Sequence, residues 1–257
     1  MQRLNVHFLP GLMNTANLAG GTVVIIDILR ASSTIITALH NGAQRVIPCG
    51  TPDEARQIRE QSHTDDVLLG GERGGVLIEG FDCGNSPTEY APGRVAGKTI
   101  AFTTTNGTRA LLKAAAAESI LIGAFVNRQA VVDRLHGDQR AVHLVCAGTD
   151  GEITGEDVLF AGAVVEALQQ RHASDLQRWK LNDGAGISHG FWRQSVGDNS
   201  QVGGDENLSA RIEAAMRVAH GGRNLIELGY DNDIRLCSIV DCIDRVPVLN
   251  RARGELS

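Results

Sequence analysis

The sequence has few aromatic residues and no long apolar run, and each absence excludes a class of protein. Phenylalanine, tryptophan and tyrosine make up 4% of the 257 residues, so a platform for stacking nucleic-acid bases is not expected. No apolar stretch reaches the ~18 residues of a transmembrane helix, so no membrane partner is expected. The opening residues, MQRLNVHFLPGLMN, also lack the long apolar core of a secretory signal.

The cysteines do not form the pattern of a disulfide framework. There are five of them, an odd number, and no CxxC pair occurs. In a chain of this length they are expected to be reduced thiols, which favours a cytoplasmic location. Cys146 ends an apolar run and is expected to pack in the core. His143 lies within the same run, and packing is expected there too rather than metal binding.

Several motifs that handle phosphate or metals are missing. The chain has no GxxxxGK[ST] loop, which excludes a P-loop NTPase, and no HExxH or clustered Cys/His metal site. No cysteine is followed by arginine six positions later, which excludes the cysteine-phosphatase loop. Leu29 stands where the haloacid-dehalogenase class needs a second aspartate after Asp27. The formal net charge of −6, without a long run of one sign, argues against a nucleic-acid partner.

The chain alternates short apolar runs with helix-like stretches. The runs end at VVIIDIL, RVIPCG, DVLLGG, KTIAFTTT, ESILIGAF and AVHLVCAG. The helix-like stretches between and after them are STIITALHNG, DEARQIREQ, TRALLKAAAA, NRQAVVDRLH and EDVLFAGAVVEALQQ. Near-continuous Val/Ile/Leu strands between helices predict an α/β fold with a largely parallel sheet covered on both faces.

Two regions depart from this alternation. Residues 172–209 are polar and glycine-rich, and they predict helices joined by loops, as an insertion over one end of the sheet. The segment DIRLCSIVDCIDRVPVL, residues 233–249, returns to strand-like alternation. No internal repeat of solenoid period occurs, and residues 1–257 are expected to form a single domain.

Two predicted strand ends combine a hydroxyl-rich turn, an arginine and a helix start. They are RASST at residues 30–34 and TTTNGTR at residues 103–109. Ligands of open parallel sheets bind beyond the carboxyl ends of the strands. The free N–H groups of a helix start, together with hydroxyls and a guanidinium, suit phosphate or sulfonate. Serine and threonine are also favoured helix N-caps, so plain capping stays an alternative.

Carboxylates supply the opposite charge. Asp27 lies inside an apolar run, where it must pair with an arginine, accept several hydrogen bonds or bind a cation. Glu156 and Asp157 follow another strand, although acidic residues are common in the first turn of a helix. Two further segments carry polar groups. Glu72 and Arg73 lie in LLGGERGG, where a glycine-rich hairpin turn with solvated charges is the alternative. Asp82, Asn85 and Ser86 lie in GFDCGNSPTEY, where Asx-turn hydrogen bonds are the alternative.

Together these motifs resemble the 2-phosphosulfolactate phosphatase family. The matching segments are VVIIDILRASSTIITALHNGA, LLGGERGG, GFDCGNSPTEY, TTTNGTRAL, FVNRQAV, LVCAGTDGEITGEDVLFAGAVVEAL and LGYDNDIRLCSIVDCIDRVPVL, and they extend from about residue 3 to residue 249. The resemblance implies a three-layer α/β/α arrangement and magnesium-dependent hydrolysis of 2-phospho-3-sulfolactate to 3-sulfolactate and phosphate, in coenzyme M biosynthesis. Where the family often reads RASTT and GFDLGNSP, this chain has RASST and GFDCGNSP.

The resemblance and the charge pattern lead to a hypothesis for the site. Mg²⁺ prefers oxygen ligands, and we expect it at Asp27 and Glu72, with Asp157 or Glu156 as a further ligand. Asp27, Arg30 and Arg109 are the candidate catalytic residues, with Asp82 in reserve as a general base. Arg30, Arg73 and Arg109 are expected to bind the anionic groups, and the anion cradle is completed by Ser32, Ser33, Thr104, Thr105, Asn106 and Gly107.

The expected ligand is therefore a small anionic phospho-acid. Enzymes of this size are often homodimers, although the sequence carries no interface signal. Two alternatives stay open: a phosphatase of the same fold for another 2-phospho-carboxylate, and a non-catalytic protein that binds anions. A substrate panel separates the first, and the joint presence of Asp27, Glu72 and Asp157 argues against the second.

Overall fold

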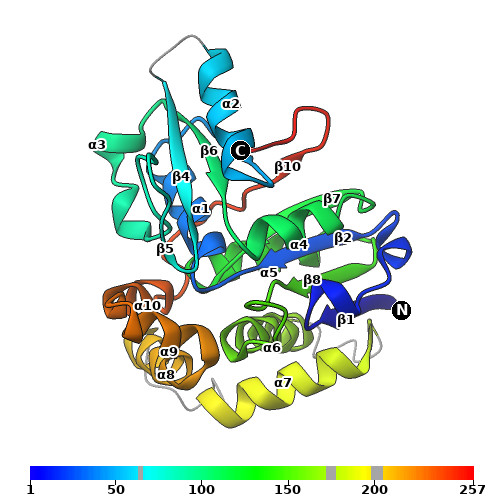
Figure 1. The fold of residues 1–257 in the computed structure, drawn as a ribbon. Helices are drawn as coiled ribbons and strands as arrows, with labels where there is room; N and C mark the ends of the chain where they lie inside the picture. Colours follow the sequence, from blue (N-terminus) through cyan, green and yellow to red (C-terminus); the bar gives the residue numbers. More distant parts are fainter. Residues whose placement is uncertain (63–65, 172–177, 198–204) are drawn as a thin grey trace.

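Two β-sheets carry the fold of the residues that the computed structural model describes, which are 1–62, 66–171, 178–197 and 205–257 (Figure 1). The first sheet is parallel throughout. Its strands lie in the order β7 (Ser119–Gly123), β2 (Thr22–Ile26), β8 (Val142–Cys146), β1 (Gln2–His7) and β9 (Trp179–Leu181).

The second sheet is mixed and lies above the first in the view of Figure 1. Its order is β10 (Leu249–Asn250), β11 (Glu255–Leu256), β3 (Arg45–Pro48), β6 (Thr99–Thr103), β4 (Val67–Arg73) and β5 (Val76–Leu77). Strands β3, β6 and β4 are parallel to one another. The outer strands pair antiparallel with their neighbours.

Helices cover both sheets and fill the space between them (Figure 1). Helix α6 (Gly155–Gln170) packs on β8 and α7 (Asp183–Val196) on β1, whereas α1 (Ala31–His40) contacts strands of both sheets and α2 (Pro52–Ser62) packs on β4 and β6. The predicted α/β class with α/β/α layers is confirmed. The other helices are α3 (Pro92–Val95), α4 (Gly107–Lys113), α5 (Arg128–His136), α8 (Asp205–Val218), α9 (His220–Glu227) and α10 (Asp231–Cys237).

The burial of the strands explains why the sequence pattern identifies them. Strands β2 (TVVII), β6 (TIAFT) and β8 (VHLVC) are buried at every position. A strand with both faces covered needs apolar residues throughout, which produces the continuous runs. The same pattern does not show that there are two sheets, because a succession of strands says nothing about which strands pair.

The strand-like interpretation of residues 233–249 is wrong for most of that segment. Helix α10 occupies its start, and of these residues Leu249 alone belongs to a strand. Asp233, Ile234 and Cys237 are the buried residues of α10, and their spacing places them on one helix face. Two aspartates in the first turn of α10 and an arginine in the last also suit the helix dipole.

The polar region at residues 172–209 contains more than loops. Helix α7 and the start of α8 confirm the expected helices, and β9 adds an edge strand beside β1. Residues 172–177 and 198–204 of this region lie outside the described residues. The sequence pattern missed β9 because it has only three residues, and it missed β1 because polar residues interrupt its apolar ones (QRLNVH).

The cysteines are all free thiols, and four of the five are buried. Cys146 is fully buried, as expected, and burial raises the pKa of its thiol well above the ordinary value. His143 is buried in the first sheet and stacks on His7. In the described part of the chain, no helix has both the length and the apolar character needed to cross a membrane.

The packing of α6 against α7 depends on Gly162, which leads to a stability prediction. A Cβ atom there would lie 2.1 Å from the carbonyl oxygen of Ser188 and 2.7 Å from Cβ of Trp192. Gly162→Ala should therefore lower the free energy of unfolding by roughly 1–3 kcal/mol, measured by urea denaturation. Gly186→Ala on exposed α7 surface is the control and should raise it by roughly 0.4–1 kcal/mol, since no atom lies within 4 Å of its Cβ. Equal effects would contradict the prediction.

Candidate active site

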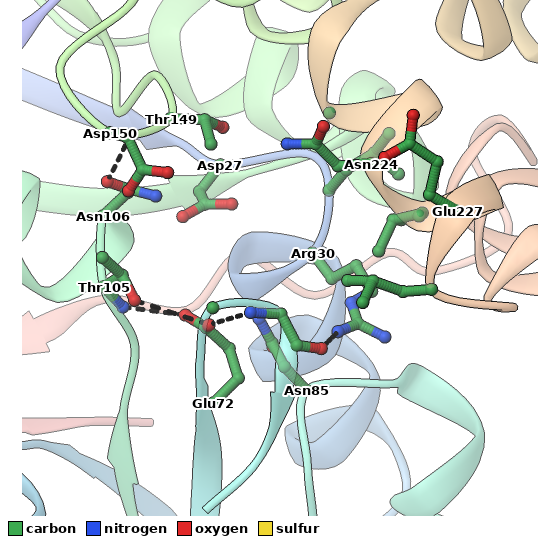
Figure 2. Close-up of a pocket in the computed structure, with 16 residues that line it drawn as sticks. Asp27, Arg30, Glu72, Asn85, Thr105, Asn106, Thr149, Asp150, Asn224 and Glu227 are labelled. Carbon is green, nitrogen blue, oxygen red and sulfur yellow. Dashed lines mark hydrogen bonds between the residues drawn. The ribbon is translucent and has the colours of Figure 1, made fainter.

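A cavity of about 270 Å³ opens where the carboxyl ends of strands from both sheets meet (Figure 2). Asp27 follows β2 and Asp150 follows β8, both in the first sheet. Glu72 lies near the end of β4 and Thr105 follows β6, both in the second sheet. The predicted strand ends are thus brought to one place, and α9 closes the opposite side with Gly221, Asn224 and Glu227.

Asp27 is held at the cavity by backbone groups. Its carboxylate accepts hydrogen bonds from the N–H of Ala31, at 3.3 Å, and from the backbone of Gly107. A Cβ atom at Gly107 would lie 2.8 Å from the carboxylate, so glycine permits this approach. Burial raises the pKa of Asp27 to about 8, with further contributions from the charges of Asp157 and Glu72.

The carboxylate of Glu72 connects the turn after β4 with the loop after β6, beside Asp27 (Figure 2). One carboxylate oxygen accepts the N–H of Thr105 at 2.8 Å, and the other accepts the N–H of Gly75 at 2.8 Å. The hydroxyl of Thr105 adds a weaker bond at 3.4 Å. These bonds fix a buried carboxylate against the cavity, with its negative charge close to that of Asp27.

Arg30 lines the cavity, but a buried partner neutralises its charge. Its Nη1 donates to a carboxylate oxygen of Asp233 at 2.7 Å, and the two side chains are only 2% and 3% exposed. The guanidinium also donates to the carbonyl of Gly75 and lies 4.2 Å from the centre of the Tyr230 ring. Asp233 also accepts the hydroxyl of Ser86 at 2.6 Å. Sequence reasoning missed Asp233 and Tyr230 because it assigned no helix there.

Asp157 and Glu156 lie behind the cavity wall and do not line it. Asp157 accepts the N–H of Ile28 at 2.9 Å and that of Gly148 at 3.0 Å, so it clamps the ends of β2 and β8 together. Burial and the charge of Glu156 raise the pKa of Asp157 to about 7. Burial also raises the pKa of Glu156 to about 7, and one of its buried oxygens has no hydrogen-bond partner.

The serine hydroxyls of the first turn point back to the strand end. Ser32 Oγ accepts the N–H of Asp27 at 3.0 Å, and Ser33 donates to the carbonyl of Ile28 at 3.0 Å. Both are buried, and neither lines the cavity. Neither serine is the N-cap of α1 either, because that position is Arg30, which makes no side-chain cap hydrogen bond. Their contacts instead hold the turn that positions Asp27.

In the second turn, residues 103–109, some polar groups bind one another at the start of α4 and others line the cavity. Each of Thr104 and Thr108 donates its N–H to the hydroxyl of the other, at 3.2 and 3.3 Å, across the start of α4. Asn106 lines the cavity and accepts the N–H of Asp150 at 3.2 Å, which ties the loop after β6 to the loop after β8. Thr105 and Asn106 thus reach the cavity. The backbone of Gly107 contacts the Asp27 carboxylate, and Thr104 lines the second, neighbouring cavity.

Three predicted site residues lie elsewhere. Asp82 accepts the N–H of Leu69 at 2.7 Å and pairs with Arg59 at 3.0 Å, away from the cavity. Arg73 follows Glu72 on β4 and, because strand side chains alternate, belongs to the opposite face. Arg73 and Arg109 line a second, neighbouring cavity.

The cavity has a donor set that suits one hard cation. No group of three or more histidine, cysteine, aspartate or glutamate side chains forms a metal cluster within the described residues. Mg²⁺ is commonly held by one or two carboxylates, with water and substrate phosphate completing its shell. Asp27 and Glu72 meet that requirement. Burial raises the pKa of Asp27, with Asp157 and Glu72 adding to the shift, so a cation beside this carboxyl would favour its ionised form.

Comparison with known proteins identifies the family. Residues 7–252 match the model of the family described as 2-phosphosulpholactate phosphatase. The chain belongs to this family. A relative from Caldanaerobacter subterraneus subsp. tengcongensis is 40% identical over 237 residues, covering 92% of this chain and 91% of the relative. Relatives from Thermotoga maritima (41% identity, covering 89% of this chain and 88% of the relative) and Carboxydothermus hydrogenoformans (34%, covering 99% and 96%) agree; all three are named probable 2-phosphosulfolactate phosphatase.

The buried pair of Arg30 and Asp233 leads to a second stability prediction. Asp233→Ala leaves the buried guanidinium without its counter-charge and should lower the free energy of unfolding by about 3–5 kcal/mol. The control is Asp231→Ala on the same helix, where an exposed pair with Arg217 contributes less than about 1 kcal/mol. Urea denaturation measures both variants. If Asp233→Ala lowers the free energy of unfolding no more than Asp231→Ala does, the Arg30–Asp233 pair does not stabilise the fold.

The raised pKa of Asp27 predicts a pH-dependent stability. A carboxyl whose pKa is higher in the folded chain than in the unfolded chain lowers the stability of the fold progressively as the pH rises from the unfolded pKa to the folded pKa. Without metal, the wild type should therefore lose stability relative to Asp27→Asn as the pH rises from about 4 towards 8. Thermal unfolding in EDTA at several pH values measures the difference in Tm. A difference independent of pH would contradict this cause.

Proposed function

We propose that this protein is a cytoplasmic, Mg²⁺-dependent phosphatase that hydrolyses 2-phospho-3-sulfolactate to 3-sulfolactate and phosphate, as in coenzyme M biosynthesis. The activity rests on family membership and on the names of the relatives. The observation that carries the metal dependence is the pair of carboxylates, Asp27 and Glu72, at the meeting point of the two sheets. The substrate is a small phospho-acid with several negative charges.

The charge of the cavity supports the need for a cation. Asp27, Glu72, Asp150 and Glu227 line it, and Arg30 is the one cationic residue among its described lining residues. Because Asp233 neutralises Arg30, the cavity repels anions when all of these carboxyls are ionised. A phosphate ester would therefore bind with a divalent cation that reverses the local charge.

Asp27 and Glu72 would hold Mg²⁺, which polarises phosphoryl oxygens and lowers the pKa of bound water. The protein residues around them supply rigidity. Glu72 is fixed by the N–H groups of Gly75 and Thr105, and the turn that carries Asp27 is fixed by Ser32. A preorganised carboxylate pair needs little rearrangement as charge moves during phosphoryl transfer.

Asn85 is suited to orient the substrate. Its side chain lines the cavity although the residue is only 6% exposed, and its Oδ1 is buried without a hydrogen-bond partner. Buried amides usually have their hydrogen bonds satisfied, so this group has unused capacity. In our proposal, Oδ1 of Asn85, which is a hydrogen-bond acceptor, binds a water molecule that in turn donates to the substrate, and Asn224 on α9 faces the cavity from the other side.

Phosphate release from a substrate panel tests the proposal. The panel contains 2-phospho-3-sulfolactate, phosphoglycerate, phospholactate and p-nitrophenyl phosphate, each with Mg²⁺ and with EDTA. We expect release that depends on Mg²⁺ and favours the sulfonate. Asp27→Asn should lower kcat/KM by roughly 100-fold or more with an unchanged circular dichroism spectrum, because one of the two carboxylates proposed to hold Mg²⁺ loses its charge.

The control for that variant is Asp183→Asn, which removes an exposed carboxylate in the first turn of α7 and should leave kcat/KM unchanged. Preferential release from another phospho-acid would keep the mechanism and replace the substrate. Release that is equally fast in EDTA would refute the metal dependence. No release from any ester would favour a protein that only binds anions.

A further inference from the structure

A second cavity, of about 590 Å³, adjoins the candidate active site. It is lined by the start of α2, the end of β4, the turn after β6 and one side of α4. Thr105 lines both cavities, so its loop forms the wall between them. The described functional site makes no use of this second space.

The charge of the second cavity is opposite to that of the first. Arg73, Arg109 and Lys113 line it, and no carboxylate is among its described lining residues. Arg109 and Lys113 are four residues apart on α4 and share one helix face. The nearby carboxylate of Glu54 accepts the N–H of Gly50 at 2.7 Å.

Arg73 is held in place by its own hydrogen bonds. One terminal nitrogen donates to the carbonyl of Glu72 at 2.6 Å, and the other donates to the hydroxyl of Thr103 at 2.9 Å. A guanidinium has five N–H donors, so donors remain for a ligand. Because the side chain is already fixed, binding an anion costs less conformational entropy than it would with a free arginine.

The two cavities contact different groups. Side chains alternate along a strand, so Glu72 and Arg73 belong to opposite faces of β4. The N–H and the hydroxyl of Thr105 both donate to Glu72. An anion beside Arg73 is therefore separated from Asp27 by the Glu72–Thr105 contact.

We propose that the second cavity is a separate binding site for a tetrahedral oxyanion, either inorganic phosphate or a sulfonate. Three cations and the hydroxyls of Thr51 and Thr108 line it, which matches the charge and the acceptor oxygens of such a ligand. The site does not depend on the proposed activity. It binds without Mg²⁺, whereas the acidic first cavity requires the cation.

Isothermal titration calorimetry with inorganic phosphate in EDTA tests this site at fixed ionic strength. The wild type should bind phosphate saturably at one site. Arg109→Ala and Lys113→Ala should each raise the Kd for phosphate by about 10-fold, since each removes a charge-assisted contact. A parallel titration with methanesulfonate separates the two sources: binding of phosphate alone assigns a phosphate site, and binding of both assigns a general oxyanion site.

Matched controls separate this site from the first cavity. Arg134→Ala removes an exposed arginine of α5 and should leave the Kd unchanged. Asp27→Asn should leave it unchanged too, and Lys113→Ala should leave kcat/KM of the Mg²⁺-loaded enzyme unchanged. The proposal is overturned if neither phosphate nor methanesulfonate binds in EDTA, if the Arg109 and Lys113 variants bind like wild type, or if Asp27→Asn strengthens binding about 10-fold. Binding of methanesulfonate alone assigns a sulfonate site. An inactive enzyme that still binds phosphate would refute the proposed activity and leave this site standing.

Discussion

The buried ion pair between Arg30 and Asp233 is the contact on which the arrangement of the site depends. Arg30 follows β2 of the first sheet, and its guanidinium also binds the carbonyl of Gly75 in the hairpin of the second sheet. Asp233 belongs to α10, far away in the sequence. One charged group therefore joins both sheets and the C-terminal helices, and these three parts supply the walls of the cavity.

Around that pair, the protein concentrates negative charge that its own groups do not balance. Burial and mutual repulsion raise the pKa values of Asp27, Glu156 and Asp157 together. A fold selected for stability alone would place apolar residues here. In our proposal, a cation at Asp27 and Glu72 would offset part of this charge, so that cation binding and the stability of the fold would be coupled.

The sequence predicts the parts of this site that depend on local pattern. Asp27, Glu72 and Thr105 follow apolar runs, and parallel strands bring such ends to one edge. Asp233 and Asn224 could not be found in this way, because they reach the cavity through long-range packing of helices whose local pattern is ambiguous. The hydrogen-bond partner of the Ser32 hydroxyl could not be predicted either, since a hydroxyl in a turn can bind a ligand or the neighbouring backbone. The number of sheets depends on strand pairing, which no local pattern contains.

Thr105 gives the two cavities a common wall, and this has an evolutionary consequence. The residue contributes to an acidic space on one side and to a basic space on the other. A substitution that enlarged or displaced it would alter both cavities at once, so at this position neither cavity can change without the other. Adaptation of one cavity to a new ligand would proceed more freely through the residues unique to it, such as Asn224 on the acidic side or Lys113 on the basic side.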